Sequence, residues 1–156
     1  MLIGRNSLFV MMVVVLLSAG CGNMVKVGVK SDNDLNIVGS GNALPVVVRV
    51  YQLSDDVGFK NAAFRDLWKK DAEALGPALL SVKEVTLQPE SKEKITFALD
   101  PKTKFVAGFA IFRNPHAAKW KFIEPVSDGF FAGYWHNFFS VGISLRLSKN
   151  TIELDN

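Results

Sequence analysis

Hydrophobic and polar residues alternate with a period of two along most of the chain beyond residue 24, a pattern typical of β-strands that bury one face. In 25–30 three valines alternate with Lys, Gly and Lys, and 139–147 holds the longest regular alternation. The run 46–53 is apolar and β-branched on both faces, which indicates a central strand. Further strands are expected at 82–87, 95–99 and 105–112, around 120–123, and at 152–154.

The segment 55–80 has a helical period instead. Asn61 is a candidate N-cap, and Gly76-Pro77 ends the segment. We expect one or two short helices whose apolar face packs on a sheet. With seven or eight strands around this insertion and no internal repeat, the pattern predicts a mainly all-β domain, a β-sandwich, over residues 25–156. The apolar residues that share one face of the helical segment are Phe64, Leu67 and Trp68.

A connection of roughly a dozen residues, rich in turn formers, separates the strand at 25–30 from the strand at 46–53. Loops this long without regular structure are uncommon in compact domains and are often functional. Two interpretations are open: a flexible hairpin loop without a function, and a binding loop on a rigid sheet. The shorter turn at Gln88-Pro89 predicts a hairpin between 82–87 and 95–99.

The first twenty residues have the parts of a secretory signal peptide. Arg5 is the only charged residue among them, and it precedes the apolar stretch 8–17. As a helix this stretch rises about 15 Å, roughly half the hydrocarbon thickness of a bilayer, so it is too short to span one. Small residues then lead to Cys21. We therefore expect residues 1–20 to be removed by cleavage between Gly20 and Cys21.

This cleavage region resembles a lipobox, although Ser18 replaces the usual Leu three residues before the Cys. The resemblance implies that Cys21 carries a diacylglyceryl group and that its new amino group takes a further acyl chain. Two or more chains hold a protein stably at a membrane, and residues 21–24 become the anchor and the start of a tether. The alternative is an ordinary signal peptide followed by an incidental cysteine. Position 22 is Gly and not Asp, which by the sorting rule of such lipoproteins implies delivery to the outer membrane.

Composition and motifs argue against catalysis and against nucleic-acid binding. The formal net charge is only +3, and the sequence shows no basic stripe. Neither His116 nor His136 has another His, a Cys or a close acid pair at metal-ligand spacing. The sequence also lacks a nucleophile elbow, a P-loop and a dinucleotide-binding glycine pattern. We expect no catalytic residues, no metal, no small-molecule substrate, and no cofactor beyond the covalent lipid.

The segment Phe130–Phe139 is the most aromatic part of the chain, with Phe, Tyr or Trp at six of its ten positions. Core filling around the start of a strand is the simpler interpretation. The alternative is an exposed aromatic patch that meets a partner or a lipid surface, where Trp and Tyr are common.

The stretch 35–45, followed by the strand 46–53, resembles the TssJ (VasD/SciN) lipoproteins of type VI secretion systems. The resemblance continues in order over nearly the whole mature chain. This chain has Ile37 and Val38 where the family often has Pro and Asp, and Glu90 where it often has Gly. The matching positions in the helical insertion, the predicted hairpin and an aromatic-basic strand pair are Phe59, Phe64, Leu67, Asp71, Leu75-Gly76, Leu79-Leu80, Glu84, Leu87, Pro89, Phe112-Arg113 and Trp120-Lys121.

The resemblance implies a transthyretin-like β-sandwich of about eight strands, anchored in the outer membrane and facing the periplasm. It implies binding to the periplasmic part of the inner-membrane protein TssM and, through it, association with TssL. The contact element of the family is the loop between the first two strands, here about 32–44. Ile37, Val38 and Leu44 are the expected apolar anchors. The partner-binding residues that the resemblance implies are Asn36, Ile37, Val38, Gly39, Ser40, Gly41, Asn42 and Leu44.

A different class of function stays open from the sequence. A periplasmic lipoprotein on a β-sandwich can also bind a small ligand or inhibit a wall-degrading enzyme. That alternative predicts a concave apolar pocket with a few convergent polar groups.

Overall fold

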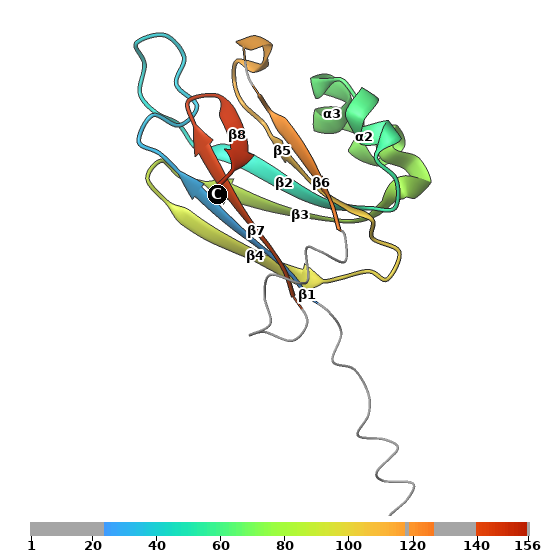
Figure 1. Cartoon of the computed structure of the whole chain (residues 1–156). Coiled ribbons are helices and arrows are strands. Elements are labelled where there is room, and N and C mark those ends of the chain that lie inside the picture. The colour runs from blue at the N-terminus through green and yellow to red at the C-terminus, as the bar shows by residue number, and fades with distance from the viewer. Residues whose placement is uncertain (1–23, 118, 127–139, 156) are drawn as a thin grey trace, which may run out of the picture.

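The computed structural model describes residues 24–117, 119–126 and 140–155, in which two four-stranded sheets pack face to face (Figure 1). Sheet A has the strand order β4-β1-β7-β8, and sheet B has the order β3-β2-β5-β6. The predicted sandwich of eight strands with a helical insertion is thus confirmed. The elements are β1 (Met24–Ser31), β2 (Val46–Leu53), α2 (Val57–Asn61), α3 (Phe64–Leu75), η1 (Gly76–Ala78), β3 (Leu79–Leu87), β4 (Lys92–Ala98), β5 (Phe105–Ala110), η2 (Pro115–Ala117), β6 (Lys121–Pro125), β7 (Ser140–Ser148) and β8 (Thr151–Leu154).

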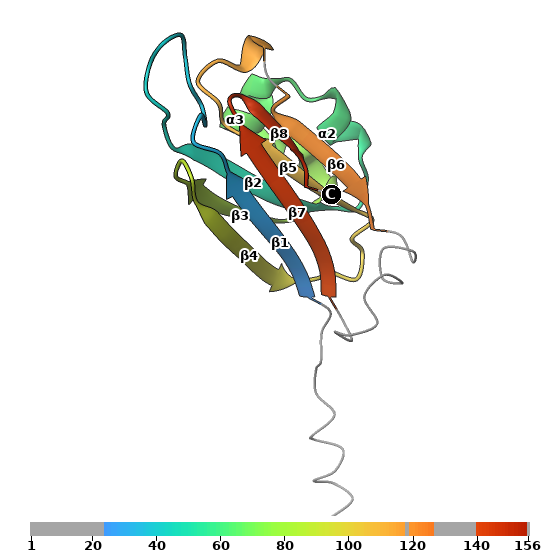
Figure 2. The ribbon, with the colours of Figure 1, turned by 60° about the vertical axis from the view of Figure 1, so that its left-hand side comes forward.

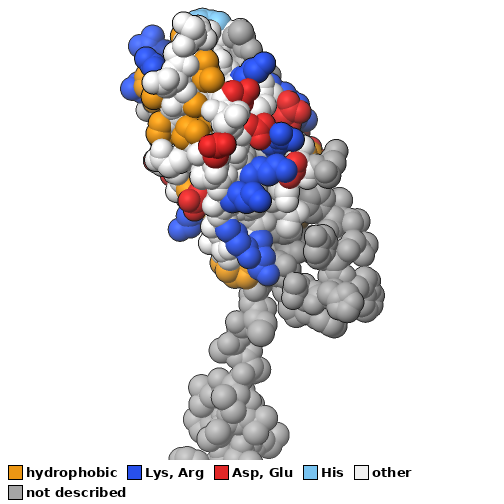
Figure 3. All heavy atoms as spheres, turned by 90° about the vertical axis from the view of Figure 1, so that its left-hand side faces the viewer, with side chains coloured by type: hydrophobic (Ala, Val, Ile, Leu, Met, Phe, Trp, Pro, Cys, Tyr) orange, Lys and Arg blue, Asp and Glu red, His pale blue; other side chains and the backbone are white. Residues whose placement is uncertain are grey.

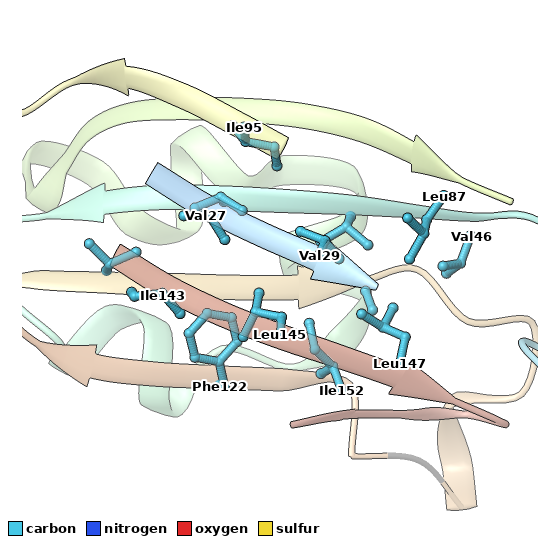
Figure 4. Close-up of a cluster of buried hydrophobic side chains, with 14 of the residues drawn as sticks. Val27, Val29, Val46, Leu87, Ile95, Phe122, Ile143, Leu145, Leu147 and Ile152 are labelled. Carbon is cyan, nitrogen blue, oxygen red and sulfur yellow. The ribbon is translucent and has the colours of Figure 1, made fainter. Parts of the chain in front are cut away.

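The period-two alternation of the sequence builds the core between the two sheets. Val25, Val27 and Val29 of β1 are buried, and the residues between them lie on the outer face of sheet A. Figure 4 shows apolar side chains from both sheets pointing into one shared layer. Burial of each such side chain contributes about 1.5–3 kcal/mol. This layer is therefore the main source of stability. Its members from sheet B include Val46, Val48, Val50, Leu87, Val106 and Phe122.

Helices α2 and α3 cover the outer face of sheet B and form a second apolar layer (Figure 1). Phe59 of α2 and Leu67 of α3 are buried in a cluster with Tyr51 and Phe109 of the sheet. The apolar face of the helical insertion therefore packs on a sheet, as the sequence predicts. Trp68 is the exception, because 43% of its surface is exposed.

Polar side chains of sheet B hold the helices in place. Arg49 Nη1 donates to the carbonyl of Leu67 at 3.0 Å and to Asp71 Oδ2 at 3.3 Å. The Tyr51 hydroxyl donates to the same carboxylate at 3.2 Å, and burial, reinforced by that negative charge, raises the pKa of the hydroxyl above its usual value. Lys121 Nζ caps the C-terminal end of α2, where a cation is favoured. It donates at 2.8–3.0 Å to the carbonyls of Phe59, Lys60 and Ala62.

Strand pairing differs from the sequence-based expectation at two connections. The expected hairpin at 88–91 is wrong, because β3 lies at the edge of sheet B and β4 at the edge of sheet A. The connection between β1 and β2 also crosses from one sheet to the other, so it is not a hairpin loop. Strand β1 instead pairs in parallel with β7. The predicted N-cap is wrong as well: Asn61 ends α2, and α3 begins after Ala63, whose N–H donates to Asp66 Oδ2 at 3.3 Å.

The two ends of the sandwich are distinct (Figure 2). At one end β1 begins, with Met24 in register with Ala98 of β4 and with Ser140 of β7. The connection 99–104 crosses between the sheets at this end, and the N–H of Val126 donates to the carbonyl of Lys104 at 2.7 Å. We call Met24, Ala98, 99–104, Pro125 and Val126 the tether end. The opposite, loop end carries the connections 32–45, 88–91, 111–117 and 149–150.

Candidate functional site

The candidate site is the connection 32–45, which leaves β1 in sheet A and enters β2 in sheet B at the loop end. Its base is built into the domain. Leu35 is completely buried and belongs to the core cluster between the sheets. The N–H of Leu44 donates back to the carbonyl of Leu35 at 3.0 Å, which closes the base of the loop. The structure therefore favours a shaped loop over a flexible connection.

Asn36 fixes the loop to its neighbours. It adopts a left-handed backbone conformation with φ of 55°, which Asn tolerates better than most residues. Its Nδ2 donates to the carbonyl of Pro45 at 2.9 Å, and its Oδ1 accepts from the N–H of Arg113 at 2.9 Å. Its own N–H donates to the carbonyl of Lys149. Asn36 is only 2% exposed, and its side chain holds the loop in shape.

An ion pair between the loop and sheet A holds the start of the loop in place. Both carboxylate oxygens of Asp32 accept from Arg146 of β7, at 2.9–3.2 Å. This pairing raises the pKa of the Arg146 guanidinium further above its usual value, so the cation persists. The N–H of Asp32 donates to the carbonyl of Leu147 at 2.9 Å. The start of the loop is thus tied to sheet A.

The tip of the loop, residues 37–43, is the part that faces solvent. Val38 is 46% exposed, and the residues from Gly39 to Asn42 are all exposed. Gly39 has φ of 63°, a conformation that favours glycine, and the N–H of Gly41 donates to the carbonyl of Val38 at 3.2 Å. Figure 3 shows hydrophobic side chains gathered on the upper part of one side of the domain. Ile37, Ala43 and Leu44 are half-buried beside the tip.

Replacing Asn36 with alanine should lower the free energy of unfolding by about 2–4 kcal/mol. Alanine is strained in the left-handed backbone conformation, and two hydrogen-bonding groups lose their partner. Urea unfolding measures the change. The matched control is Asn42→Ala in the exposed tip, which should change stability by less than about 0.5 kcal/mol. Equal effects of the two substitutions would show that Asn36 does not fix the loop.

A shallow hollow of about 500 Å³ beside the base of the loop is lined by Asp32, Asp34, Glu90 and Arg146 among others. Within the described ranges, no group of three or more His, Cys, Asp or Glu side chains is arranged to bind a metal ion. His116 lies exposed in η2, and His136 lies outside the described residues.

Several predicted features fall outside the described part of the chain. These are Gly20 and Cys21, and the aromatic segment Phe130–Phe139. No helix among the described residues is long and apolar enough to cross a bilayer. Sequence reasoning did not connect the loop with Arg113, whose N–H binds Asn36, or with Asn150, whose Nδ2 donates to the carbonyl of Ile37 at 3.4 Å. Contacts of this kind between distant segments leave no signal in the sequence.

A further hollow lies between the edge strands β6 and β8 and has a volume of about 540 Å³. Besides apolar residues it is lined by the charged side chains Lys60, Lys119, Lys121, Glu124 and Glu153. Apolar and charged side chains thus share the lining of this hollow. The small-ligand alternative stays a prediction of the sequence alone.

Comparisons with known proteins agree with the fold. A family model described as type VI secretion lipoprotein (VasD, EvfM, TssJ) matches residues 23–150. A search of curated proteins finds no match. The crystal structure of the lipoprotein TssJ1 from the type VI secretion system of Pseudomonas aeruginosa is 22% identical, with a TM-score of 0.74 over 86% of this chain and 95% of that chain.

Two further solved structures share the architecture. One matching chain belongs to a structure described as a type VI membrane complex; it is 25% identical, with a TM-score of 0.73 over 86% of this chain and 98% of that chain. Another belongs to a structure described as the TssM C-terminal domain (869–1107) from EAEC. That chain is 23% identical, with a TM-score of 0.68 over 86% of this chain and 98% of the other.

Proposed function

The chain belongs to the type VI secretion lipoprotein family (VasD, EvfM, TssJ), and we propose that it docks the membrane complex of such a system to the outer membrane by binding a TssM-type protein. The family is one of secretion-system lipoproteins and is not an enzyme family. In this proposal the acylated Cys21 inserts in the outer membrane, and the loop tip contacts the periplasmic part of TssM. TssL joins through TssM.

The observation that carries the proposal is an exposed apolar tip on a buried, hydrogen-bonded base. Val38 is exposed, whereas Leu35 and Asn36 two or three residues earlier are almost completely buried. Docking of a flexible loop costs about 1–2 kcal/mol for each residue that becomes fixed. Because the base is already fixed in the free protein, this cost is limited to the few residues of the tip. The loop is thus suited to protein binding.

The TssM structure supports the choice of partner. The match aligns 86% of this chain with 98% of the matching chain, so that chain has about the length of this protein. Residues 869–1107 of TssM form a considerably longer segment. The matching chain is therefore shorter than the TssM segment of that structure, and its size is that of a small partner of the TssM domain.

The fold also separates the two proposed attachments. Cys21 precedes the tether end by three residues, and the loop leaves the opposite end of β1. A strand of eight residues spans about 25 Å. The lipid and the loop tip can therefore be engaged at the same time, without competition for one surface.

The sharpest test exchanges two tip residues rather than deleting the loop. Deletion of 33–42 would remove the buried Leu35 and Asn36 and unfold the base. The double variant Ile37→Asp, Val38→Asp keeps the base and places two charges in the proposed contact. Because buried unpaired charges oppose association, affinity for the periplasmic domain of the cognate TssM should fall by about 100-fold or more. Calorimetric titration measures this change.

Val57→Asp serves as the matched control, because Val57 is also an exposed valine, on α2. It should leave the affinity unchanged. Circular dichroism and urea unfolding confirm that both proteins are folded. An affinity that is the same in the tip variant and in the control would contradict the loop assignment. Failure of the unmodified protein to bind TssM would contradict the proposed function itself.

A further inference from the structure

We propose that the tether end of the sandwich is itself a membrane-contacting surface, which rests on anionic phospholipid headgroups through Lys102 and Lys104. The inference rests on the proposed lipid anchor at Cys21 and adds to it a contact made by the folded domain. Without such a contact, a lipoprotein domain is free to turn on its tether. With it, the loop end points away from the bilayer.

The length of the tether brings this end to the lipid surface. Only Gly22 and Asn23 separate Cys21 from Met24, the first residue of β1. Three residue steps reach at most about 11 Å. Because Met24 is in register with Ala98, the connection 99–104 begins beside the tether. The folded domain therefore cannot move far from the headgroups, and 99–104 lies at the end that faces them.

The charges of this connection suit an anionic surface. Lys102 and Lys104 are both exposed, and no described carboxylate forms a salt bridge with either ammonium group. Asp100 is the only acidic residue in the connection, and its Oδ1 accepts from the N–H of Lys102 at 2.8 Å. The exposed Asp55, just after β2, adds one carboxylate at this end, and its Oδ1 accepts from the N–H of Val57 at 2.8 Å. Lys26 adds a further cation two residues into β1. Each lysine near an anionic leaflet strengthens partitioning by about fivefold.

The backbone N–H groups of 100–104 are satisfied inside the protein, which suits a surface that displaces water. The N–H of Asp100 and the hydroxyl of Thr103 both donate to Gln52 Oε1, at 2.9 and 2.7 Å. The N–H of Thr103 donates to the carbonyl of Asp100 at 3.0 Å, and that of Lys104 to the carbonyl of Leu53 at 2.9 Å. With Lys102 bonded to Asp100 and with proline at 101, each backbone N–H from 100 to 104 is either paired or absent.

Gln52 explains how the connection keeps this shape. It is 1% exposed, an unusual place for an amide, and its Nε2 donates to the carbonyl of Ala98 and to Ser81 Oγ, both at 2.8 Å. One buried side chain thereby joins β2 and β3 to both ends of the connection. The two lysines are presented on a fixed support, so little conformational freedom is lost when they meet the headgroups.

Two lysines alone bind a membrane weakly, but the tether raises the concentration at which the domain meets the surface. An anchored domain meets the surface at an effective concentration in the millimolar range, so a weak contact is enough to set its orientation. Because the contact is electrostatic, it should weaken as salt shortens the screening length from about 10 Å at 0.1 M to about 3 Å at 1 M.

The test uses the full acylated protein in vesicles. Cys21 is the only cysteine, and acylation consumes its thiol, so an introduced cysteine is the single site for a fluorophore. We place it at Pro101→Cys in the tether end or at Asn42→Cys in the loop tip, both exposed positions. Vesicles of phosphatidylethanolamine and phosphatidylglycerol carry a nitroxide quencher on the headgroup, and phosphatidylcholine vesicles serve as the neutral surface.

Quenching at position 101 should exceed that at position 42 severalfold. To separate binding from simple proximity, roughly ten Gly and Ser residues are inserted between Asn23 and Met24, which adds about 17 Å of mean reach. Quenching at 101 should persist with this insert in anionic vesicles. It should be lost in neutral vesicles, at 1 M salt and in the double variant Lys102→Ser, Lys104→Ser. The matched control, Lys92→Ser with Lys94→Ser on β4, should retain it.

Three results would overturn the proposal: equal quenching at both positions, loss of quenching on tether extension despite native lysines, or equal loss in the two lysine variants. Failure of the proposed anchor gives a different result. In that case mass spectrometry shows an unmodified sulfur at Cys21, and the protein does not float with any vesicle.

Discussion

Replacing Cys21 with serine should move essentially all of the protein from the membrane fraction to the soluble periplasmic fraction. A serine hydroxyl does not replace the thiol that takes the diacylglyceryl group, so the acyl chains are missing. Each buried CH₂ of such a chain contributes about 0.8 kcal/mol to membrane binding, and several chains together dominate every other contact with the bilayer. Fractionation and labelling with radioactive palmitate measure the result.

The same variant should still bind the periplasmic domain of TssM in solution. The loop leaves β1 at the end opposite to the tether, so loss of the lipid does not alter its base. Ser18→Leu is the control: it restores the residue that lipoboxes usually have at this position and should keep the protein in the membrane. Persistent membrane attachment of the Cys21→Ser protein, with palmitate still incorporated, would contradict the anchor.

The largest effect on stability is expected for Gly108→Val in the centre of sheet B. Gly108 of β5 lies opposite Phe122 of β6, and the aromatic ring lies over the glycine. A Cβ atom at this position would lie 1.8 Å from Phe122 Cε1 and 2.6 Å from Cδ1, so the ring must leave its place in the core. Overpacking combined with the loss of a buried phenylalanine should cost about 3–5 kcal/mol, measured by urea unfolding.

Gly28→Val is the matched control, because Gly28 is also a strand glycine but faces outward on sheet A. The nearest atom to a Cβ added at this position would be Ser144 Oγ at 3.8 Å, an ordinary contact. This variant should change stability by less than about 1 kcal/mol. The double variant Gly108→Val, Phe122→Ala should be less destabilised than the sum of its single changes, because the valine then occupies space that the ring has left. Additive effects would show that the ring is not the obstacle.

Much of the fold follows from local patterns. Alternation identifies the buried valines of β1 and of β2, because a strand turns successive side chains to opposite faces whatever its neighbours are. The helical insertion follows from the change of period around Leu67. The length and composition of the connection between the first two strands locate the loop, and the resemblance to a lipobox implies the anchor at Cys21.

Other features are not accessible from local patterns, because they depend on pairs of residues far apart in the chain. Alternation shows which face of a strand is buried but not which strand lies beside it. The turn at 88–91 therefore has the sequence of a hairpin although it joins two sheets. Asn36 lies in a turn-rich stretch of the sequence, where an exposed side chain is expected. Its contacts with Pro45 and Arg113 nevertheless bury it.

The sequence by itself determined the strands with their buried faces and the place of the long loop, and it predicts a secretion signal and a lipidation site. These depend on the chemistry and spacing of neighbouring residues. Only the tertiary structure decided that the loop and the start of β1 lie at opposite ends, that the side chain of Asn36 is buried and holds the loop in shape, and that Gln52 holds a second exposed connection beside the start of β1. Those outcomes depend on strand partners dozens of residues away, whose choice is made when the two sheets close over one core.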